Sequence, residues 1–382
     1  MIRTLSACAV MAGLVAAVPL EAGAEVELET LTVEKSIKEG PNVFLVDWGI
    51  NVSSKITVLG ADDLSMKGNM GAGAFAQAVL SADGNTLYTA SVYLSRYTYG
   101  DLTAVMHEYD VATLTARREF VISEKLAQAE SQPALLALTP DERFMIVQNA
   151  TPATSVSIVD LEQGKEIAEV PTPGCWGGIP AIDAMQFTAL CGDGTMISHS
   201  FDGKGGFSDP ARSKVVFDPE ADALFTNPIR NKDGDLVFMS FNGNFYVVKD
   251  SNGAPELIGK HAIGGADAGW APGGSEVMTY HAPTDTAFIS MHSKAYDGSH
   301  KNGAEEIWAV DMTTMKLVGR IKGHHENSVY ITQTEQPTLF GSGESGGISK
   351  YTIGFKGGQV SGEKVGDFGG LAFFPTLVFA TQ

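Results

Sequence analysis

Histidines are the side chains of this sequence that could bind a metal ion, and the chain has eight of them. His292 and His300 lie on either side of the polar turn SKAYDGS, which would allow a pair of ligands. His324 and His325 are adjacent, and adjacent residues on a strand point to opposite faces, so they cannot share one metal. The other four have no partner at a ligand spacing. We therefore predict no metal site in this chain.

Catalytic groups of other kinds are also not evident. The sequence contains no H-E-x-x-H and no P-loop motif. The Gly-rich string GSGESGG (341–347) lies between short strands, where a turn is expected, so Ser345 is not a candidate nucleophile. Neighbouring carboxylates, Asp62–Asp63 and Glu305–Glu306, more often form a solvated edge than an acid–base pair. The residue types favour a binding or scaffolding subunit over a self-sufficient enzyme.

The N-terminal residues 1–24 have the features of a secretory signal peptide. Arg3 supplies a positive charge, an apolar run extends over 7–18, and Ala22-Gly23-Ala24 is a small-x-small cleavage site. The run is too short for a membrane span. Leu5 to Cys8 has the letters of a lipoprotein box, but there the apolar run should precede the cysteine. We predict cleavage after Ala24 and a mature, periplasmic chain of one domain, 25–382.

Cleavage would leave two cysteines, Cys175 and Cys191, in the strings GCWGGIP and LCGDG. An even number of cysteines in an exported protein predicts a disulfide, here a structural one. The net charge of −19 excludes a basic footprint for nucleic acid.

The main architectural signal is a repeat of β-rich runs, tight turns and strand-terminal aspartates. About seven copies follow one another at about 40 to 60 residues, the period of a propeller blade. Asp-Gly and Asn-Gly pairs mark tight hairpins within the copies. The sequence predicts an all-β fold, a seven-bladed β-propeller of four-stranded antiparallel blades. We place the blades at 43–75, 76–122, 130–170, 171–217, 224–259, 270–321 and 324–362.

Two further segments and four tryptophans complete the predicted architecture. The apolar C-terminal string LAFFPTLVFA (371–380) should form a last strand, and LETLTVEKS (28–36) could pair with it or with the last blade. Strands from both termini would then close the ring and remove exposed edges. The four tryptophans stand in different blades and should fill the gaps between blades; they are Trp48, Trp176, Trp270 and Trp308.

Several long strings resemble the heavy subunit of quinoprotein amine dehydrogenases. They are VQNATPATSVSIVDLEQG (147–164), GCWGGIP (174–180) with LCGDG (190–194), GWAPGG (269–274) and FISMHSKAYDGSHKNGAEEIWAVD (288–311). The similarity extends over about 71–320. It looks closer to the aromatic (aralkyl) amine dehydrogenase type than to methylamine dehydrogenase.

The resemblance implies a periplasmic assembly of two heavy and two light subunits. It also implies a seven-bladed propeller with a disulfide at Cys175 and Cys191. In this family the light subunit, which is small and disulfide-dense, carries the catalytic Asp and tryptophan tryptophylquinone. The assembly oxidises a primary amine to an aldehyde and ammonia and passes electrons to a blue copper protein, azurin or amicyanin. The expected partners include no nucleic acid and no membrane.

One family position can be carried over to this chain. A heavy-subunit Phe at the end of the first blade lines the substrate channel, and the string GAGAFAQAVLSADG (71–84) places it at Phe75. The alternative is an ordinary Phe between blades. Here the string has one residue fewer after Phe75, and Asp101 and Leu102 stand where relatives carry basic residues, while Arg96 is kept.

Two other functions stay open from the sequence. One is a self-sufficient propeller hydrolase or lactonase, which would need clustered His, Asp or Glu at the central channel. The other is a periplasmic interaction module without a redox role.

Overall fold

The computed structural model describes residues 33–50, 53–183, 185–251, 253–343 and 345–381. The chain divides into two compact units, Met1–Lys35 and Ser36–Gln382. Residues 33–35, the described part of the first unit, contain no helix or strand. The predicted signal peptide and its cleavage site lie outside the described residues and stay predictions. The second unit contains the strands that follow.

The described residues form five four-stranded antiparallel sheets. Four of them use four strands that are consecutive in the sequence, and the first uses three consecutive strands and the C-terminal strand. The first sheet contains β28 (Pro375–Ala380), β1 (Asn42–Asp47), β2 (Ser54–Gly60) and β3 (Met66–Ala72). The second contains β4 (Ala74–Leu80), β5 (Thr86–Arg96), β6 (Tyr99–Asp110) and β7 (Thr115–Ile122). The third contains β8 (Leu136–Leu138), β9 (Phe144–Asn149), β10 (Ser155–Asp160) and β11 (Lys165–Pro171). The fourth contains β12 (Cys175–Pro180), β13 (Gln186–Cys191), β14 (Met196–Ser200) and β15 (Ala211–Arg212). The fifth contains β16 (Ile229–Arg230), β17 (Leu236–Met239), β18 (Asn244–Lys249) and β19 (Glu256–Ala262).

A sixth sheet has eight strands. They are β20 (Ala271–Pro272), β21 (Met278–His281), β22 (Thr286–His292), β23 (Ala304–Asp311), β24 (Lys316–Ile331), β25 (Thr338–Gly343), β26 (Gly347–Lys356) and β27 (Gln359–Phe368). The long strand β24 belongs to both halves of this sheet. Its first half pairs with β23, from Lys316 opposite Asp311 onward, and its second half pairs with β25, ending with Ile331 opposite Leu339.

The prediction of a propeller built from four-stranded antiparallel blades is confirmed, whereas five separate four-stranded sheets stand where seven separate blades were expected. The reason is that β24 passes from one half of the sixth sheet to the other without a loop. A change of register marks the passage, and His325 adopts a φ of 63° there.

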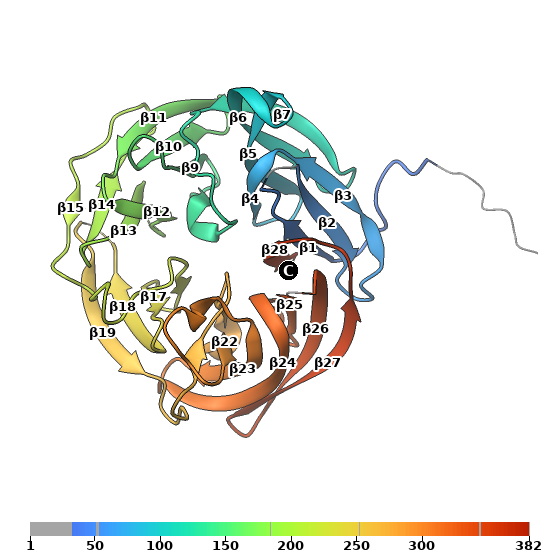
Figure 1. Ribbon diagram of the computed structural model, residues 1–382, viewed down its shortest axis with the longest axis vertical. Helices are drawn as coiled ribbons and strands as arrows, with labels where there is room; N and C mark the ends of the chain where they lie inside the picture. Colours follow the sequence, from blue (N-terminus) through green and yellow to red (C-terminus); the bar gives the residue numbers. More distant parts are fainter. Residues whose placement is uncertain (1–32, 51–52, 184, 252, 344, 382) are drawn as a thin grey trace, which may run out of the picture. The chain divides into compact units, whose positions relative to one another are not determined.

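The sheets of the second unit follow one another around a ring in chain order (Figure 1). The C-terminal strand β28 completes the first sheet by pairing with β1, with Val43 opposite Ala380. The predicted last strand is therefore confirmed, and its partner is β1. Most of the segment 28–36, the other predicted partner, lies outside the described residues.

Short helices occur only as single turns in the described ranges: η1 (Pro133–Leu135), η2 (Ala282–Thr284) and η3 (Ser299–Lys301). None of the helices in the described part of the chain has the length and apolar character that a membrane crossing requires.

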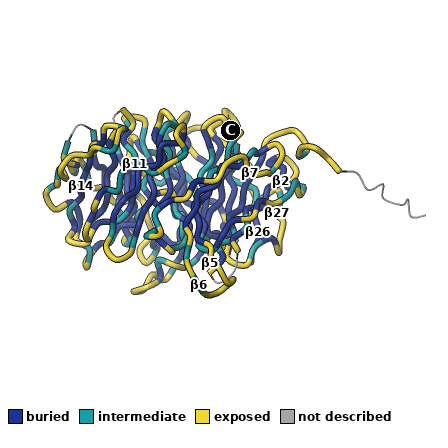
Figure 2. The backbone as a smooth tube through the Cα atoms, turned by 90° about the horizontal axis from the view of Figure 1, so that it is seen from above, coloured by how far each residue is buried: buried dark blue, intermediate teal, exposed yellow. Residues whose placement is uncertain are grey.

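The middle strands of the sheets are buried, and the turns at the two ends of the ring are exposed (Figure 2). Every residue of β9, β10, β13 and β22 is buried, whereas the outer strands β19 and β27 are mostly exposed. Both faces of a middle strand are covered because neighbouring sheets pack face to face. Trp308 is fully buried in a cluster that joins the fifth and sixth sheets, as predicted, and Trp270 packs against it.

The repeated strand-terminal aspartates bind the turn that follows each strand. Asp110, Asp160 and Asp311 each accept a hydrogen bond from the backbone N–H three residues later, at 2.7, 2.8 and 2.7 Å. Side-chain bonds of this kind satisfy backbone donors that a tight turn leaves without a partner. The repeat in the sequence is therefore a repeat of turn geometry.

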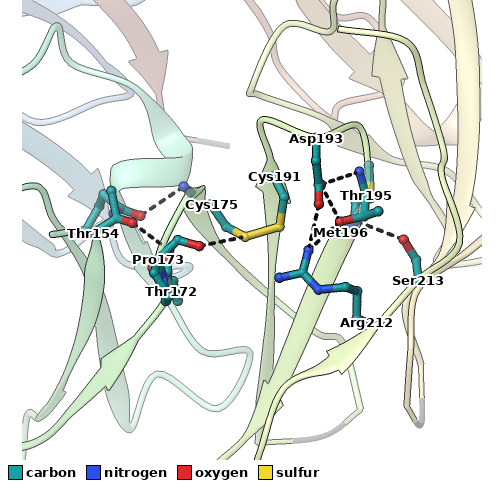
Figure 3. Close-up of a disulfide and its surroundings, with 12 residues drawn as sticks. Thr154, Thr172, Pro173, Cys175, Cys191, Asp193, Thr195, Met196, Arg212 and Ser213 are labelled. Carbon is teal, nitrogen blue, oxygen red and sulfur yellow. Dashed lines mark hydrogen bonds and ion pairs between the residues drawn. A yellow bond between two sulfur atoms is a disulfide. The ribbon is translucent and has the colours of Figure 1, made fainter.

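Cys175 and Cys191 lie opposite each other on β12 and β13 and form a disulfide with an S–S distance of 2.00 Å (Figure 3). Both cysteines are buried against Ala189 and Ile197. The next turn is held by Asp193, which accepts hydrogen bonds from the N–H and the hydroxyl of Thr195, at 3.0 and 2.6 Å. The bridge therefore ties together the start of one sheet and its first hairpin.

Replacing both cysteines by alanine should lower the free energy of unfolding by about 3 kcal/mol, because the bridge closes a loop of this length in the unfolded chain. Urea unfolding of the oxidised wild type and of the double variant measures the difference. Wild type whose disulfide has been reduced should unfold like the variant. Equal midpoints for all three proteins would show that the bridge adds no stability.

Asp160 should contribute stability that disappears in acid. Its side chain has no exposed surface, and the guanidinium of Arg143, 2.8 Å away, lowers the Asp160 pKa from 3.8 to about 2. A carboxyl group with a lowered pKa stabilises the fold above its unfolded pKa and loses that effect as the pH falls through the folded value. Asp160→Asn should therefore be less stable than wild type at neutral pH, and the difference should shrink between about pH 4 and pH 2.

Glu162→Gln is the matched control for this measurement. Glu162 pairs with the same arginine at 2.7 Å, but its side chain is 73% exposed, and exposed pairs contribute little. Thermal melting of the three proteins across this pH range gives the comparison. A constant gap between Asp160→Asn and wild type at all pH values would contradict the ionic explanation.

Candidate functional site

Phe75, the predicted channel residue, lies at the start of β4, the inner strand of the second sheet. Its φ of 57° lies in the left-handed region, which residues with a side chain rarely adopt. The register between β4 and β5 shifts between Ala74 and Gln77, so Phe75 stands in a bulge. Bulges re-aim side chains, and backbone strain of this kind is concentrated at functional sites. The geometry therefore marks Phe75 as unusual.

Neighbouring segments hold Phe75 in this conformation. Its N–H donates to the carbonyl oxygen of Gly49 at 2.9 Å. The hydroxyl oxygen of Ser54 accepts the N–H groups of Gly49 and Ala76, at 3.0 and 3.2 Å. The Phe75 ring contacts Trp48 edge to face, with centroids 5.6 Å apart. The side chain is partly exposed, so one side of this aromatic pair faces solvent.

The segment before β28 extends the aromatic surface. A carboxylate oxygen of Asp47 accepts the backbone N–H groups of Phe373 and Phe374, at 2.9 and 2.8 Å. The carbonyl oxygen of Phe374 accepts the N–H of Trp48 at 2.9 Å. Phe373 is nevertheless 84% exposed. An ordered backbone therefore presents an exposed phenyl ring beside Trp48.

The hairpin between β5 and β6 adds three more aromatic rings at the same end of the ring. β5 is antiparallel to β4, so its last residues lie beside the first residues of β4. Tyr97 and Tyr99 are 77% and 70% exposed, Tyr93 is also exposed, and the Arg96 guanidinium lies 4.6 Å from the Tyr99 ring centroid. We call residues 47–50, 73–75, 93–102 and 373–375 the Phe75 face.

The Phe75 face is suited to binding an apolar or aromatic group and not to proton transfer. Its aromatic rings offer flat apolar surface, and the indole Nε1 of Trp48 is buried without a hydrogen-bond partner in the described part of the chain. Its aspartate Asp47 already accepts two backbone hydrogen bonds. Asp101, which stands where relatives carry a basic residue, also lies on this face. Its N–H donates to the Ser95 hydroxyl at 3.0 Å.

The two histidines considered as a ligand pair, His292 and His300, have different contacts. His292 is buried at the end of β22, with Nδ1 3.1 Å from the carbonyl oxygen of Ser293. His300 stacks on Phe241 with centroids 4.1 Å apart, and burial lowers the pKa of His300. Within the described ranges, no group of three or more His, Cys, Asp or Glu side chains could hold a metal ion.

The other groups considered for catalysis have structural contacts. Glu306 accepts hydrogen bonds from Arg320 and from the indole of Trp308, at 2.5 and 2.8 Å. Its neighbour Glu305 accepts the hydroxyl of Ser293 at 2.8 Å. The adjacent carboxylates therefore bind different partners. Ser345 lies in the turn between β25 and β26, as predicted.

Sequence reasoning missed Glu276. This residue lines a central cavity of about 800 Å³, and desolvation raises its pKa well above the ordinary value of a glutamate. The available signal was a single carboxylate in the otherwise uncharged string GWAPGGSEVMTYH (269–281). That signal becomes informative only when the neighbouring sheets are known, because they bury the Oε2 atom of the carboxylate.

Comparison with known structures supports the fold. The periplasmic gluconolactonase of Pseudomonas aeruginosa superposes with a TM-score of 0.62 and 14% identity over 90% of this chain and 99% of that one. A 6-phosphogluconolactonase-like protein of Bacteroides fragilis superposes with a TM-score of 0.59 and 13% identity, over 90% and 99% of the two chains. At these identities the likeness concerns the fold alone.

Comparison with known sequences identifies the family. A heavy chain of methylamine dehydrogenase from Methylobacillus flagellatus is 24% identical over 358 residues, 92% of this chain and 87% of that one. The corresponding chain of Methylophilus methylotrophus is 23% identical over 95% and 90%. The profile of the family described as methylamine dehydrogenase heavy chain matches residues 42–381, a range that includes every described strand from β1 to β28. This chain therefore belongs to the methylamine dehydrogenase heavy chain family.

Proposed function

We propose that this chain is the non-catalytic heavy subunit of a periplasmic amine dehydrogenase. The complex would oxidise a primary, aromatic amine to an aldehyde and ammonia and pass the electrons to a blue copper protein such as azurin or amicyanin. The observation that carries the proposal is the family match over 42–381. The heavy chains that match over most of their length come from methylamine dehydrogenases.

A light subunit would supply the chemistry. Its tryptophan tryptophylquinone would accept the electrons of the amine when the two chains are assembled, with two heavy and two light subunits in the complex. This role fits a chain in which the described residues include no cluster of metal ligands and in which the adjacent carboxylates are bound by other groups. This chain would bind the light subunit and shape the substrate channel, and it would not transfer protons.

We infer that the propeller has seven blades, with the two halves of the eight-stranded sheet counted separately. The halves pack against each other through a buried cluster that includes Phe288 and Ile307 on one side and Leu339 and Tyr351 on the other. Separate clusters of the same kind join the neighbouring four-stranded sheets. Each half therefore packs as the separate sheets do.

The Phe75 face would border the light subunit and the substrate channel. Phe75 and Trp48 form a partly exposed aromatic pair held by hydrogen bonds from three segments. A rigid wall loses little conformational entropy when it binds. Its flat apolar surface would favour the ring of an aromatic amine over a small alkyl group. The exposed rings of Phe373, Tyr97 and Tyr99 would offer contact area to the second chain.

The mature chain expressed alone should not oxidise 2-phenylethylamine or tyramine with a dye acceptor. Activity should arise when the chain is co-expressed with a small, cysteine-rich light chain and its maturation factors, because the quinone belongs to that chain. Steady-state dye reduction measures both. A chain that turns over substrate alone, with dependence on an added metal, would support the hydrolase alternative and refute the proposal.

Phe75→Ala should lower the ratio of kcat/KM for 2-phenylethylamine to that for methylamine by about fivefold, because an aromatic contact of about 1 kcal/mol is lost for one substrate only. Quinone absorbance should be unchanged. Phe355→Ala is the matched control. Phe355 is also a partly exposed phenylalanine, but it lies at the end of β26, outside the Phe75 face. An unchanged ratio in Phe75→Ala would reject the channel role.

Phe75→Gly separates the side chain from the backbone. Glycine adopts a φ of 57° without strain, so this variant should be more stable than Phe75→Ala by about 1 kcal/mol. Both variants should change the substrate ratio equally, because both remove the ring. If the ratio of kcat/KM for the two amines changed in only one variant, the change would be due to the backbone and not to loss of the ring.

A further inference from the structure

The centre of the ring contains a cavity of about 800 Å³ on the side away from the Phe75 face. It is lined by the second half of β4 and by β21, β28 and the second half of β24. β4 starts at the Phe75 face, so its end and the following turn, with Ser81 and Gly84, lie at the opposite end and surround the mouth. The cavity is therefore distinct from the aromatic face.

Glu276 lies in the wall of this cavity, next to the start of β21. Its backbone is fixed, since its N–H donates to the carbonyl oxygen of Asn327 at 3.0 Å and its own carbonyl oxygen accepts the N–H of Val329 at 3.1 Å. Gly274 permits this approach: its φ is 131°, and a Cβ there would lie 2.5 Å from the same Asn327 oxygen. The backbone position of Glu276 is thus set by its contacts with β24.

Among the described residues, none is a hydrogen-bond or ion-pair partner of the Glu276 carboxyl group. Its Oε2 atom is buried without a hydrogen bond, and Glu276 forms no ion pair with another described residue. Desolvation is the cause of its raised pKa. A desolvated carboxylate without a counter-charge is costly, and a cation bound beside it would remove that cost.

The other charged groups of the cavity do not supply this cation. Arg230 also lines the wall, but its guanidinium forms two bonds with Asp250, at 2.9 and 2.8 Å, and donates to the carbonyl oxygens of Gly234 and Pro180. Glu142 stands near the mouth and accepts the N–H of Ala82 at 2.5 Å. The arginine is therefore paired with its aspartate and does not act as a counter-ion for Glu276.

Most of the remaining wall is apolar. Apolar residues that line it include Val79, Leu136, Met278, Val329 and Leu377. A metal ion would need several oxygen ligands, and the described residues contain no cluster that provides them. An organic cation with an apolar body would instead use both the charge and the walls.

We propose that the central cavity binds a small primary ammonium ion with an apolar body, such as an arylalkyl ammonium, with Glu276 as the counter-ion. The ammonium group would donate to the carboxylate, and the hydrocarbon part would lie along the apolar walls. The volume of about 800 Å³ is in the range of known small-molecule sites. This binding site does not depend on the proposed light subunit or on amine oxidation.

Isothermal titration calorimetry on the full mature chain tests the proposal. The probe is 2-phenylpropan-2-amine, which has no hydrogen on the carbon that bears nitrogen and so is not a dehydrogenase substrate. The neutral comparison is 2-phenylpropan-2-ol, which has a similar shape. Wild type should bind the ammonium form about tenfold or more tightly than the alcohol, as expected for a charge-assisted hydrogen bond.

Glu276→Gln should remove this preference, because it keeps the shape and removes the charge. Glu363→Gln, which removes an exposed carboxylate on the outer strand β27, should keep it. Thermal melting establishes that both variants fold. Two results would overturn the proposal: equal affinity of wild type and Glu276→Gln for the amine, or full competition by sodium or calcium ions, which would indicate an inorganic cation site.

Discussion

Each sheet of this protein can bury its two faces only against its neighbours in the ring. The buried clusters show this directly, because they combine residues of adjacent sheets: Phe44 and Ile56 of the first sheet lie with Leu87 and Tyr109 of the second. The last junction depends on β28, which joins the C-terminal residues to β1. Its Val378 is buried in a cluster with Val43 and Phe340. Without this strand the first sheet would lack its inner member, so the ring and its core depend on pairing between the two ends of the unit.

The closed ring explains how strained and exposed groups keep fixed positions. Phe75 has an unfavourable φ, and Phe373 exposes most of its ring, yet both are attached to backbone that other segments hold with hydrogen bonds. Strain of this size persists only where the surroundings determine the conformation. A surface of this kind suits a subunit that shapes a site whose reactive groups belong to another chain.

The two ends of the ring have different chemistry because the strand directions alternate. The aromatic Phe75 face lies at the end of the ring where β4 and β28 start, while the cavity is lined in part by the turn that follows β4. Aromatic rings dominate the first, and two carboxylates with apolar walls dominate the second. The two surfaces can therefore bind different ligands without competing.

The sequence by itself determined the local structure of this protein. The strand-terminal aspartates, the Asp-Gly turns and the apolar runs predicted antiparallel four-stranded sheets, because the geometry of a turn depends on a few neighbouring residues. The cysteine count predicted the Cys175–Cys191 pair, and the apolar C-terminal string predicted β28. Trp308 was identified as a residue between sheets from its size alone.

Only the tertiary structure decided the features that depend on contacts between distant segments. The continuity of β24, the positive φ of Phe75 and the contact of Asp47 with the residues before β28 each require segments far apart in the sequence. The same holds for Glu276, which reads as an ordinary charged residue until β24 and the surrounding strands bury one oxygen of its carboxylate in the wall of the cavity. Local patterns specify hydrogen bonding between near neighbours, whereas burial and charge balance are set by which sheets the closed ring brings together.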